Sequence, residues 1–153
     1  MDKVVFTDTA AETEALAADL AENLPPDISV IALFGDMGAG KTAFTRGFMA
    51  GLKYGGVVSS PTYAIVNEYL SPRGAVFHFD WYRLSGEAEL YDLGWDEYLE
   101  RGLCIVEWSE RAPEVLPPER TLIIEISTSE DASEVCRLER EPSRRREVRL
   151  RRL

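Results

Sequence analysis

The sequence predicts an α/β fold, a single three-layer domain in which helices cover both faces of a mixed, partly parallel sheet. An apolar run, Val30–Phe34, leads directly into a glycine-rich loop, and a helical stretch follows that loop. Strand-like and helix-like stretches alternate along the rest of the chain, which is typical of this class. The chain has 153 residues, which suits one hydrophobic core, and no linker-like segment divides residues 1–153.

Local sequence patterns predict the elements of the first third of the chain. Residues 4–6 are strand-like, and residues 10–24 are rich in Ala, Leu and Glu at helical spacing. Thr9-Ala10-Ala11-Glu12 has the spelling of a helix-starting capping box, and two prolines stop that helix. Residues 29–34 form the strand that enters the glycine-rich loop, and residues 41–52 form the helix that leaves it.

The middle of the chain predicts a hairpin and an interrupted helix. Residues 64–70 and 75–80 are strand-like and are joined by a turn that reads Ser-Pro-Arg-Gly. Residues 87–99 have helical character, with an interruption near Gly94.

The last third predicts mostly strands. Residues 103–106 form a short buried strand, a proline-bounded connection covers residues 113–118, and residues 120–127 form a further strand. Two more strand-like runs cover residues 134–138 and 148–153, and a helix is the alternative for the last of them.

The glycine-rich loop, Gly35 to Thr42, reads GDMGAGKT and matches the phosphate-loop pattern G-x-x-x-x-G-K-[ST]. Its glycines allow successive backbone N–H groups to face a phosphate chain, and the next helix adds its positive end. Lys41 would reach the β and γ phosphates, and Thr42 would bind Mg²⁺. An ordinary turn is the alternative, but the flanking strand and helix favour a nucleotide site. The residues expected to bind the nucleotide are Gly35, Asp36, Met37, Gly38, Ala39, Gly40, Lys41, Thr42 and Ala43.

Two carboxylates follow strand-like runs and are candidates for the Mg²⁺ shell. Glu107 ends the apolar run LCIVE, and Asp80 ends AVFHFD, which is less uniformly apolar. The strand character favours Glu107 as the metal ligand. Asp80 would share the ion through water or position the attacking water. Surface carboxylates at strand ends are the alternative for each.

Three further features could contribute. A loop containing Ser60 to Tyr63 can bring the Thr62 hydroxyl to the γ-phosphate side and respond to the terminal phosphate, although a simple turn is the plainer interpretation. Arg83 could neutralise phosphate charge, or it could pair with a surface carboxylate. Trp108 could pack on the loop or mark a contact surface, but we expect it in the core.

The net charge of −10 conceals an asymmetry. Residues 1–136 carry nine basic and 24 acidic side chains, and residues 137–153 carry eight arginines and three glutamates. The acidic body argues against broad binding of nucleic acid. The arginine-rich segment, about 137–153, could contact nucleic acid locally, dock an acidic partner or be a solvated terminal element. We expect it to belong to the same domain or to form a short tail.

The composition predicts a cytoplasmic protein without a membrane segment. No apolar run approaches the roughly 20 residues of a membrane helix, and the N-terminus lacks a signal-peptide pattern. Cys104 and Cys136 are far apart in the sequence, as in a reduced cytosolic protein. His78 is the single histidine, which makes a zinc site of histidines and cysteines unexpected.

Four motifs in series resemble one family, the bacterial threonylcarbamoyladenosine biosynthesis ATPase TsaE (YjeE). They are GDMGAGKT, SPTY, HFDWYRL and VEWSER, and the resemblance covers roughly residues 5–127. The HxDxYR motif of the family corresponds to His78, Asp80, Tyr82 and Arg83, with Trp81 where leucine is usual. The chain from Glu130 onward does not resemble the family diagnostically.

The resemblance implies a P-loop protein that binds ATP and Mg²⁺ and hydrolyses ATP slowly by itself. It implies two partners, TsaD and TsaB, whose complex transfers threonylcarbamoyl to adenosine 37 of tRNA, so that contact with tRNA is indirect. By the same resemblance, Thr42 and Glu107 hold Mg²⁺, Lys41 holds phosphates, Asp80 is needed for hydrolysis and Thr62 lies in a switch-like loop. A small-molecule kinase is the alternative, but no arginine-rich lid insertion lies beside the loop.

Overall fold

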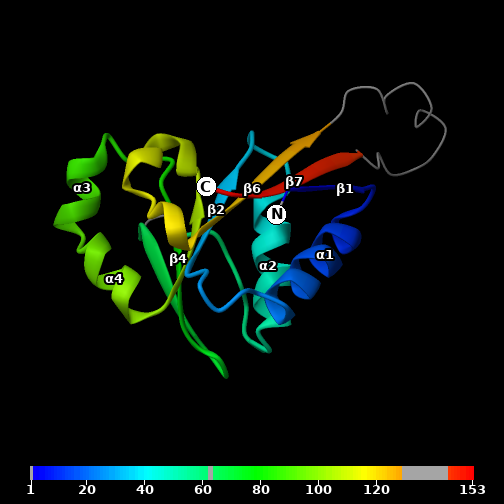
Figure 1. Cartoon of the computed structure of the whole chain (residues 1–153), viewed down its shortest axis with the longest axis horizontal. Helices are drawn as coiled ribbons and strands as arrows, with labels where there is room; N and C mark the ends of the chain where they lie inside the picture. The colour runs from blue at the N-terminus through cyan, green and yellow to red at the C-terminus, as the bar shows by residue number, and fades with distance from the viewer. Residues whose placement is uncertain (1, 62–63, 129–144) are drawn as a thin grey trace.

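The computed structural model describes residues 2–61, 64–128 and 145–153, and the elements follow the predicted order (Figure 1). The strands are β1 Lys3–Thr7, β2 Val30–Phe34, β3 Val66–Ser71, β4 Gly74–Asp80, β5 Leu103–Glu107, β6 Thr121–Thr128 and β7 Arg146–Arg152. The helices are α1 Ala10–Glu22, α2 Lys41–Gly51, α3 Glu87–Asp92 and α4 Trp95–Arg101. Short 3₁₀ turns at Ser109–Arg111, Pro113–Val115 and Pro118–Arg120 connect β5 to β6. No helix in these ranges is long and apolar enough to cross a membrane.

The strands form a seven-stranded sheet in the order β1-β7-β6-β2-β5-β4-β3. Its centre is parallel, since β2 pairs with both β5 and β6, and β5 pairs with β4. Its two sides are antiparallel, with β1-β7-β6 on one side and the β3-β4 hairpin on the other. The predicted mixed sheet is therefore confirmed. The last run is the strand β7, so the helix alternative for residues 148–153 is wrong, and the predicted strand at 134–138 lies outside the described residues.

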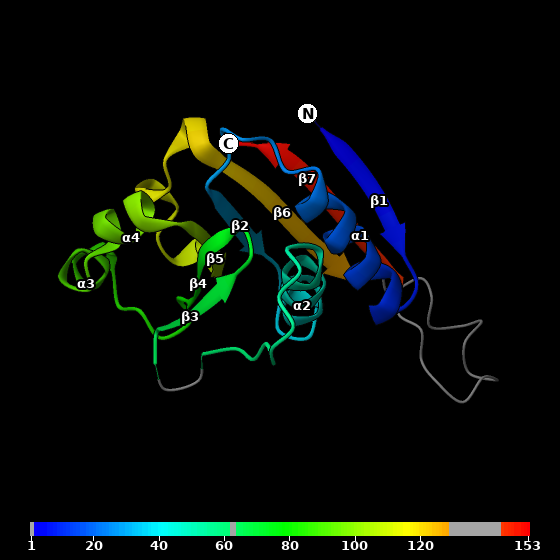
Figure 2. The same cartoon turned by 90° about the horizontal axis from the view of Figure 1, so that it is seen from below.

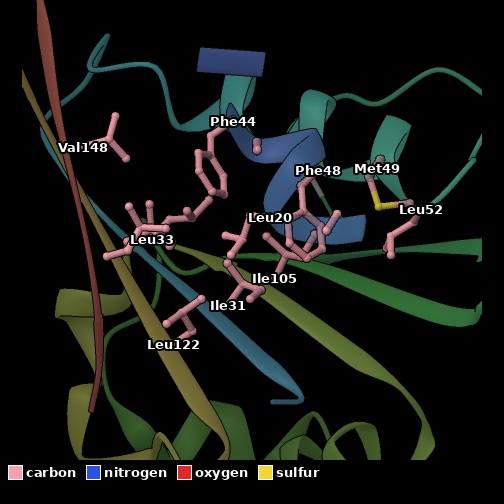
Figure 3. Close-up of a cluster of buried hydrophobic side chains, with 14 of the residues drawn as sticks. Leu20, Ile31, Leu33, Phe44, Phe48, Met49, Leu52, Ile105, Leu122 and Val148 are labelled. Carbon is pink, nitrogen blue, oxygen red and sulfur yellow. The ribbon is translucent and has the colours of Figure 1, made fainter. Parts of the chain in front are cut away.

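The central strand β2 is buried on both faces, because one pair of helices covers each side of the sheet and the sheet with these two pairs forms three layers. Ile31 and Leu33 join the cluster under α1 and α2, whereas Val30 and Ala32 join the cluster that includes α3 and α4. All four side chains are fully buried, as expected for a strand covered on both sides. Figure 3 shows the first cluster, and Figure 2 shows α1 and α2 packed over their part of the sheet, away from α3 and α4. Cys104 is buried in β5, and Cys136 lies outside the described residues.

The first helix begins where the capping spelling predicts. The Thr9 hydroxyl accepts a hydrogen bond from the Glu12 N–H at 3.1 Å, which satisfies one of the free donors of the first turn. The Glu12 carboxylate accepts from the N–H of Asp8 at 2.7 Å, one residue before the position of an ideal capping box. The interruption predicted near Gly94 is also present, because Gly94 has a left-handed φ of 84° and separates α3 from α4.

Three arginines of β7 make ion pairs, two of them with the acidic body of the protein. The distances are 2.6 to 3.0 Å, and the pairs are Arg151–Glu125, Arg152–Asp27 and, within β7 itself, Arg149–Glu147. The hydrogen bond from Arg152 lowers the pKa of the Asp27 carboxyl below its ordinary value. The described end of the arginine-rich segment is thus a paired strand of the sheet and carries charges complementary to its neighbours.

Two glycines let α1 and α2 pack unusually closely. A Cβ atom at Gly47 would lie 2.6 Å from the carbonyl carbon of Glu14, and one at Gly51 would lie 2.8 Å from the Cα of Ala18. Both obstacles are backbone atoms of α1, which cannot move aside as a flexible side chain would. The spacing of four residues places both glycines on the same side of α2. This close crossing fixes the helix that begins at the phosphate loop.

We expect Gly47→Ala to destabilise the protein by about 1–3 kcal/mol, because overpacking against backbone outweighs the gain of about 1 kcal/mol in helix propensity. Urea denaturation of both proteins measures the difference. The matched control is Gly55→Ala, since a Cβ there meets nothing within 4 Å. A Gly47→Ala protein as stable as the wild type would contradict the inferred packing constraint.

Candidate nucleotide-binding site

The glycine-rich loop connects β2 to α2 in a conformation suited to wrapping an anion. Gly40 precedes the helix with a φ of 113°, in the range that favours glycine. A Cβ atom at Gly35 would lie 2.5 Å from the carbonyl oxygen of Ile126, so the loop passes directly against the end of β6. The first turn of α2 then presents free backbone N–H groups at the loop.

The loop forms one wall of a cavity of about 310 Å³. Of the nine residues predicted to bind nucleotide, Asp36, Met37, Gly38, Gly40, Lys41 and Thr42 line this cavity. Gly35 and Ala39 belong to the same loop, and Ala43 lies in the first turn of α2. The opposite wall consists of Ser60, Asp80, Tyr82, Glu107 and Trp108. The fold therefore brings the loop together with both carboxylates that the sequence singled out.

Lys41 is the buried cation of the cavity, with 7% of its surface exposed. Its ammonium group donates hydrogen bonds to the carbonyl oxygens of Gly35 and Asp36, the latter at 3.2 Å. It also lies 3.9 Å from the centre of the Trp108 ring, a cation–π contact. Burial lowers the pKa of Lys41, and the neighbouring carboxylates, Glu110 first, oppose that effect. The ammonium is thus held at the loop by two carbonyl acceptors and an aromatic ring, and an anion could replace the carbonyl groups as its partner.

Thr42, Ser60 and Glu107 form a cluster of oxygen atoms beside Lys41. The hydroxyls of Thr42 and Ser60 are 3.0 Å apart. Ser60 donates to one carboxylate oxygen of Glu107 at 3.1 Å, and Thr42 approaches the other at 3.4 Å. Glu107 is 3% exposed at the end of β5. A hydroxyl and a carboxylate at this spacing are hard oxygen donors, the type that Mg²⁺ prefers.

Asp80 ends β4 directly beside Glu107, with which it is paired in the parallel register. One of its carboxylate oxygens accepts the N–H of Tyr82 at 2.9 Å. Burial raises the pKa of Asp80, and the charge of Glu107 adds to that effect. The hydrogen bond from Tyr82 acts in the opposite direction. Asp80 therefore holds a proton more readily than an exposed aspartate does.

The loop predicted to act as a switch is described only in part. Thr62 and Tyr63 lie outside the described residues. The preceding residues are tied to β3, because the Ser59 carbonyl accepts hydrogen bonds from the Tyr69 hydroxyl and the Asn67 amide, each at 3.1 Å. Ser60 then joins the oxygen cluster at Glu107. One end of this loop is therefore in contact with the candidate metal ligands.

The position of Trp108 differs from the one that the sequence predicted. We expected it in the core, but it lines the cavity and has a left-handed φ of 58°, which is strained for a bulky residue. Its ring lies over Lys41, and the ring of Tyr82 packs against it with centroids 4.9 Å apart. The fully buried tryptophans are Trp81 and Trp95. The sequence signal for this role was the position directly after Glu107, at the turn that leaves β5.

His78 and Arg83 have different surroundings. His78 is fully buried behind the site, with its Nε2 atom 3.3 Å from a carboxylate oxygen of Glu107. The sequence reasoning did not assign it a role, although it lies two residues before Asp80 in the same strand and on the same side. Arg83 is exposed, and among the described residues it does not belong to the cavity lining.

Residues 7–139 match the family described as "Threonylcarbamoyl adenosine biosynthesis protein TsaE". The chain belongs to the TsaE family. Its TsaE relative in Bacillus subtilis (strain 168), a tRNA threonylcarbamoyladenosine biosynthesis protein, is 42% identical over 125 residues, covering 81% of this chain and 77% of the relative. The TsaE protein of Haemophilus influenzae is 39% identical over 107 residues, covering 69% and 67%. The crystal structure of Bacillus subtilis YdiB is similar with a TM-score of 0.66 and 30% identity, covering 98% of this chain and 84% of that one.

The environment of Asp80 predicts a stability effect that depends on pH. A carboxyl whose pKa is higher in the folded state than in the unfolded state destabilises the fold once the pH exceeds both values. We expect Asp80→Asn to raise the melting temperature of the nucleotide-free protein at pH 7. The gain should shrink as the pH falls through the raised pKa towards the ordinary value of about 3.9.

Thermal unfolding at several pH values measures this difference. Glu119→Gln is the matched control, because it makes the same change from carboxylate to amide at an exposed position. An Asp80→Asn protein that is less stable than the wild type at pH 7 would mean that the charged form of Asp80 supports the fold.

Proposed function

We propose that this TsaE-family protein is a Mg²⁺-dependent ATP-binding and ATP-hydrolysing accessory protein of tRNA threonylcarbamoyladenosine biosynthesis. The observation that carries the proposal is the convergence of the phosphate loop with Glu107 and Asp80 on one cavity. Family membership supports the pathway, because the relatives carry that process in their names. Its ATP cycle would support repeated turnover of the threonylcarbamoyl-transferase complex.

ATP binding is supported by the chemistry of the loop. Backbone N–H groups at the start of a helix favour negative charge, and the glycines allow a close approach of phosphate oxygens. Lys41 would leave the carbonyl groups of Gly35 and Asp36 and pair with phosphate, which as an anion is a stronger partner than a carbonyl. Lys41 already lines the cavity that the phosphates would occupy.

The residues present fit a magnesium ion. Thr42 and Glu107 supply the oxygen atoms that would hold it, and phosphate oxygens would complete the shell, as is usual for Mg²⁺. When bound, the ion neutralises charge on the phosphates. Ser60 donates a hydrogen bond to Oε2 of Glu107, and Nε2 of His78 lies 3.3 Å from the same oxygen, so both residues would orient this carboxylate.

Asp80 suits a role in hydrolysis. Its carboxylate faces the same cavity but lies beyond Glu107 along the sheet edge, at the neighbouring strand. A raised pKa makes a carboxylate a better acceptor of a proton from water. We assign Asp80 to positioning the attacking water, with Lys41 stabilising the phosphates and Thr62 responding to the terminal phosphate.

The proposed partners are the TsaD and TsaB subunits of the transferase complex, with tRNA contacted only indirectly. The loop from Ser59 reaches the oxygen cluster and could transmit the presence of a terminal phosphate to a bound protein. We place the site of action in the cytoplasm, where tRNA modification occurs.

Separate defects are expected when the two carboxylates are removed. Glu107→Ala should raise the Mg²⁺ concentration required for half-maximal hydrolysis. Asp80→Ala should leave ATP affinity within a few-fold and lower hydrolysis by roughly 10²-fold, because a water-positioning group acts mainly in the transition state. Calorimetry measures ATP affinity, and single-turnover experiments measure the rate of hydrolysis. If Asp80→Ala lost ATP binding and Glu107→Ala kept it, Asp80 would be the metal ligand and Glu107 the water-positioning group.

The nucleotide state should control partner binding. We expect the protein with an ATP analogue to bind a TsaD–TsaB pair at least tenfold more tightly than with ADP, which corresponds to about 1.4 kcal/mol. Thr62→Ala should reduce that preference while ATP affinity falls only modestly. Equal partner affinities in the two states of the wild type would exclude a switch. ATP turnover with nucleosides or sugars, but not with the partners, would favour the kinase alternative.

A further inference from the structure

Arg146 reaches the phosphate loop from the far end of the chain. It is the first residue of β7, and its backbone is paired on both sides, with Thr7 of β1 and Thr128 of β6. Its side chain lies on the same side of the strand as Val148, which belongs to the cluster under α1 and α2. The Nε–H of Arg146 donates a hydrogen bond to the carbonyl oxygen of Ala39 at 3.1 Å.

The arginine also packs against the residue that follows Ala39. A Cβ atom at Gly40 would lie 3.1 Å from Nε and 3.3 Å from Cδ of Arg146, so the guanidinium end rests directly on the bare Cα of Gly40. Gly40 lines the cavity, and among the described residues Arg146 does not. The arginine therefore contacts the loop from behind.

The geometry of a peptide bond gives this contact a consequence for anion binding. In a trans peptide the C=O of one residue and the N–H of the next point in opposite directions. A donor that holds the Ala39 carbonyl outward thus holds the Gly40 N–H on the opposite side, towards the cavity. A loop whose N–H groups face an anion must turn carbonyl groups outward, and each buried one needs a donor.

We propose that Arg146 is a positioning residue of the phosphate loop. It orients the Ala39–Gly40 peptide so that the Gly40 N–H faces the anion, and it places a permanent positive charge behind the loop. This inference deepens the proposed function, because it names a residue that prepares the site for nucleotide phosphates. Its hydrogen bond has a charged donor, which makes it stronger than a neutral one.

The other arginines of β7 provide a contrast. Within residues 145–153, Arg149, Arg151 and Arg152 pair with carboxylates, whereas Arg146 makes its hydrogen bond to the loop backbone. Arg151 lies five residues along the same strand, on its opposite face, and pairs with Glu125 of β6. It carries the same charge, whereas Arg149 lines a hollow beside Gly35 and Asp36 of the loop, so Arg151 is the matched control.

The test compares Arg146→Met, Arg146→Lys and Arg151→Met with the wild type in the full chain. Calorimetry with ADP and with a non-hydrolysable ATP analogue should show an affinity about tenfold lower for Arg146→Met. Arg146→Lys should recover part of the loss, because it restores a cation and one donor. Arg151→Met should bind as the wild type does. The amide resonance of Gly40 in nucleotide-free, isotope-labelled protein should move in Arg146→Met and remain in place in Arg151→Met.

The two readouts separate the possible failures. A role confined to fold stability would lower the melting temperature of Arg146→Met without changing the Gly40 resonance or the affinity of the folded protein, and that result would overturn the inference. If the wild type bound neither nucleotide, the proposed function would fail. The Gly40 resonance would still decide whether Arg146 orients the loop. If Arg146→Met does not fold, the same two measurements on Arg146→Lys decide, since unchanged values there refute a role that depends on the guanidinium.

Discussion

Parallel pairing around β2 is the constraint on which the site depends. Because β2, β5 and β4 run in the same direction, their carboxyl ends reach the same edge of the sheet. The loop after β2, Glu107 at the end of β5 and Asp80 at the end of β4 therefore meet, although they are far apart in the sequence. The burial of β2 on both faces stabilises this arrangement, since neither neighbouring strand can shift without exposing apolar side chains.

The electrostatic balance at this edge is unusual for a buried region. Lys41 has little exposure and lies near several carboxylates. Burial lowers the pKa of Lys41 and raises the pKa of Asp80, so it favours the neutral form of each. Neither group is in the environment that would best stabilise it in the absence of a ligand. An arrangement of this kind is typical of sites in which an anion and a cation supply the missing charges.

The sequence could predict the features that depend on neighbouring residues. The Thr9 cap, the glycine-rich loop and the β3–β4 hairpin are encoded within a few positions, and Glu107 and Asp80 follow from the rule that strand ends gather. The sequence left the core and the phosphate loop open as places for Trp108, and its position after Glu107 could not decide between them. The left-handed φ of Trp108, which accompanies its place in the cavity, has no signature in the sequence. The contact of Arg146 could not be predicted from the sequence either. Arg146 lies 107 positions from Ala39, and nothing in the sequence distinguishes it from the other seven arginines of the basic segment.

The place of β7 in the sheet has a consequence for synthesis of the chain. β7 lies between β1 and β6, so β1 has no strand partner within the described sheet until residues 146–152 have left the ribosome. During translation the earlier strands can pair around β2, while β1 and the outer edge of β6 stay open. A ribosome that stalled before residue 146 would release a chain in which the outer edge of β6 and both edges of β1 are unpaired, and such edges promote aggregation. Completion of the last strand therefore covers the edges through which the shorter chain would aggregate.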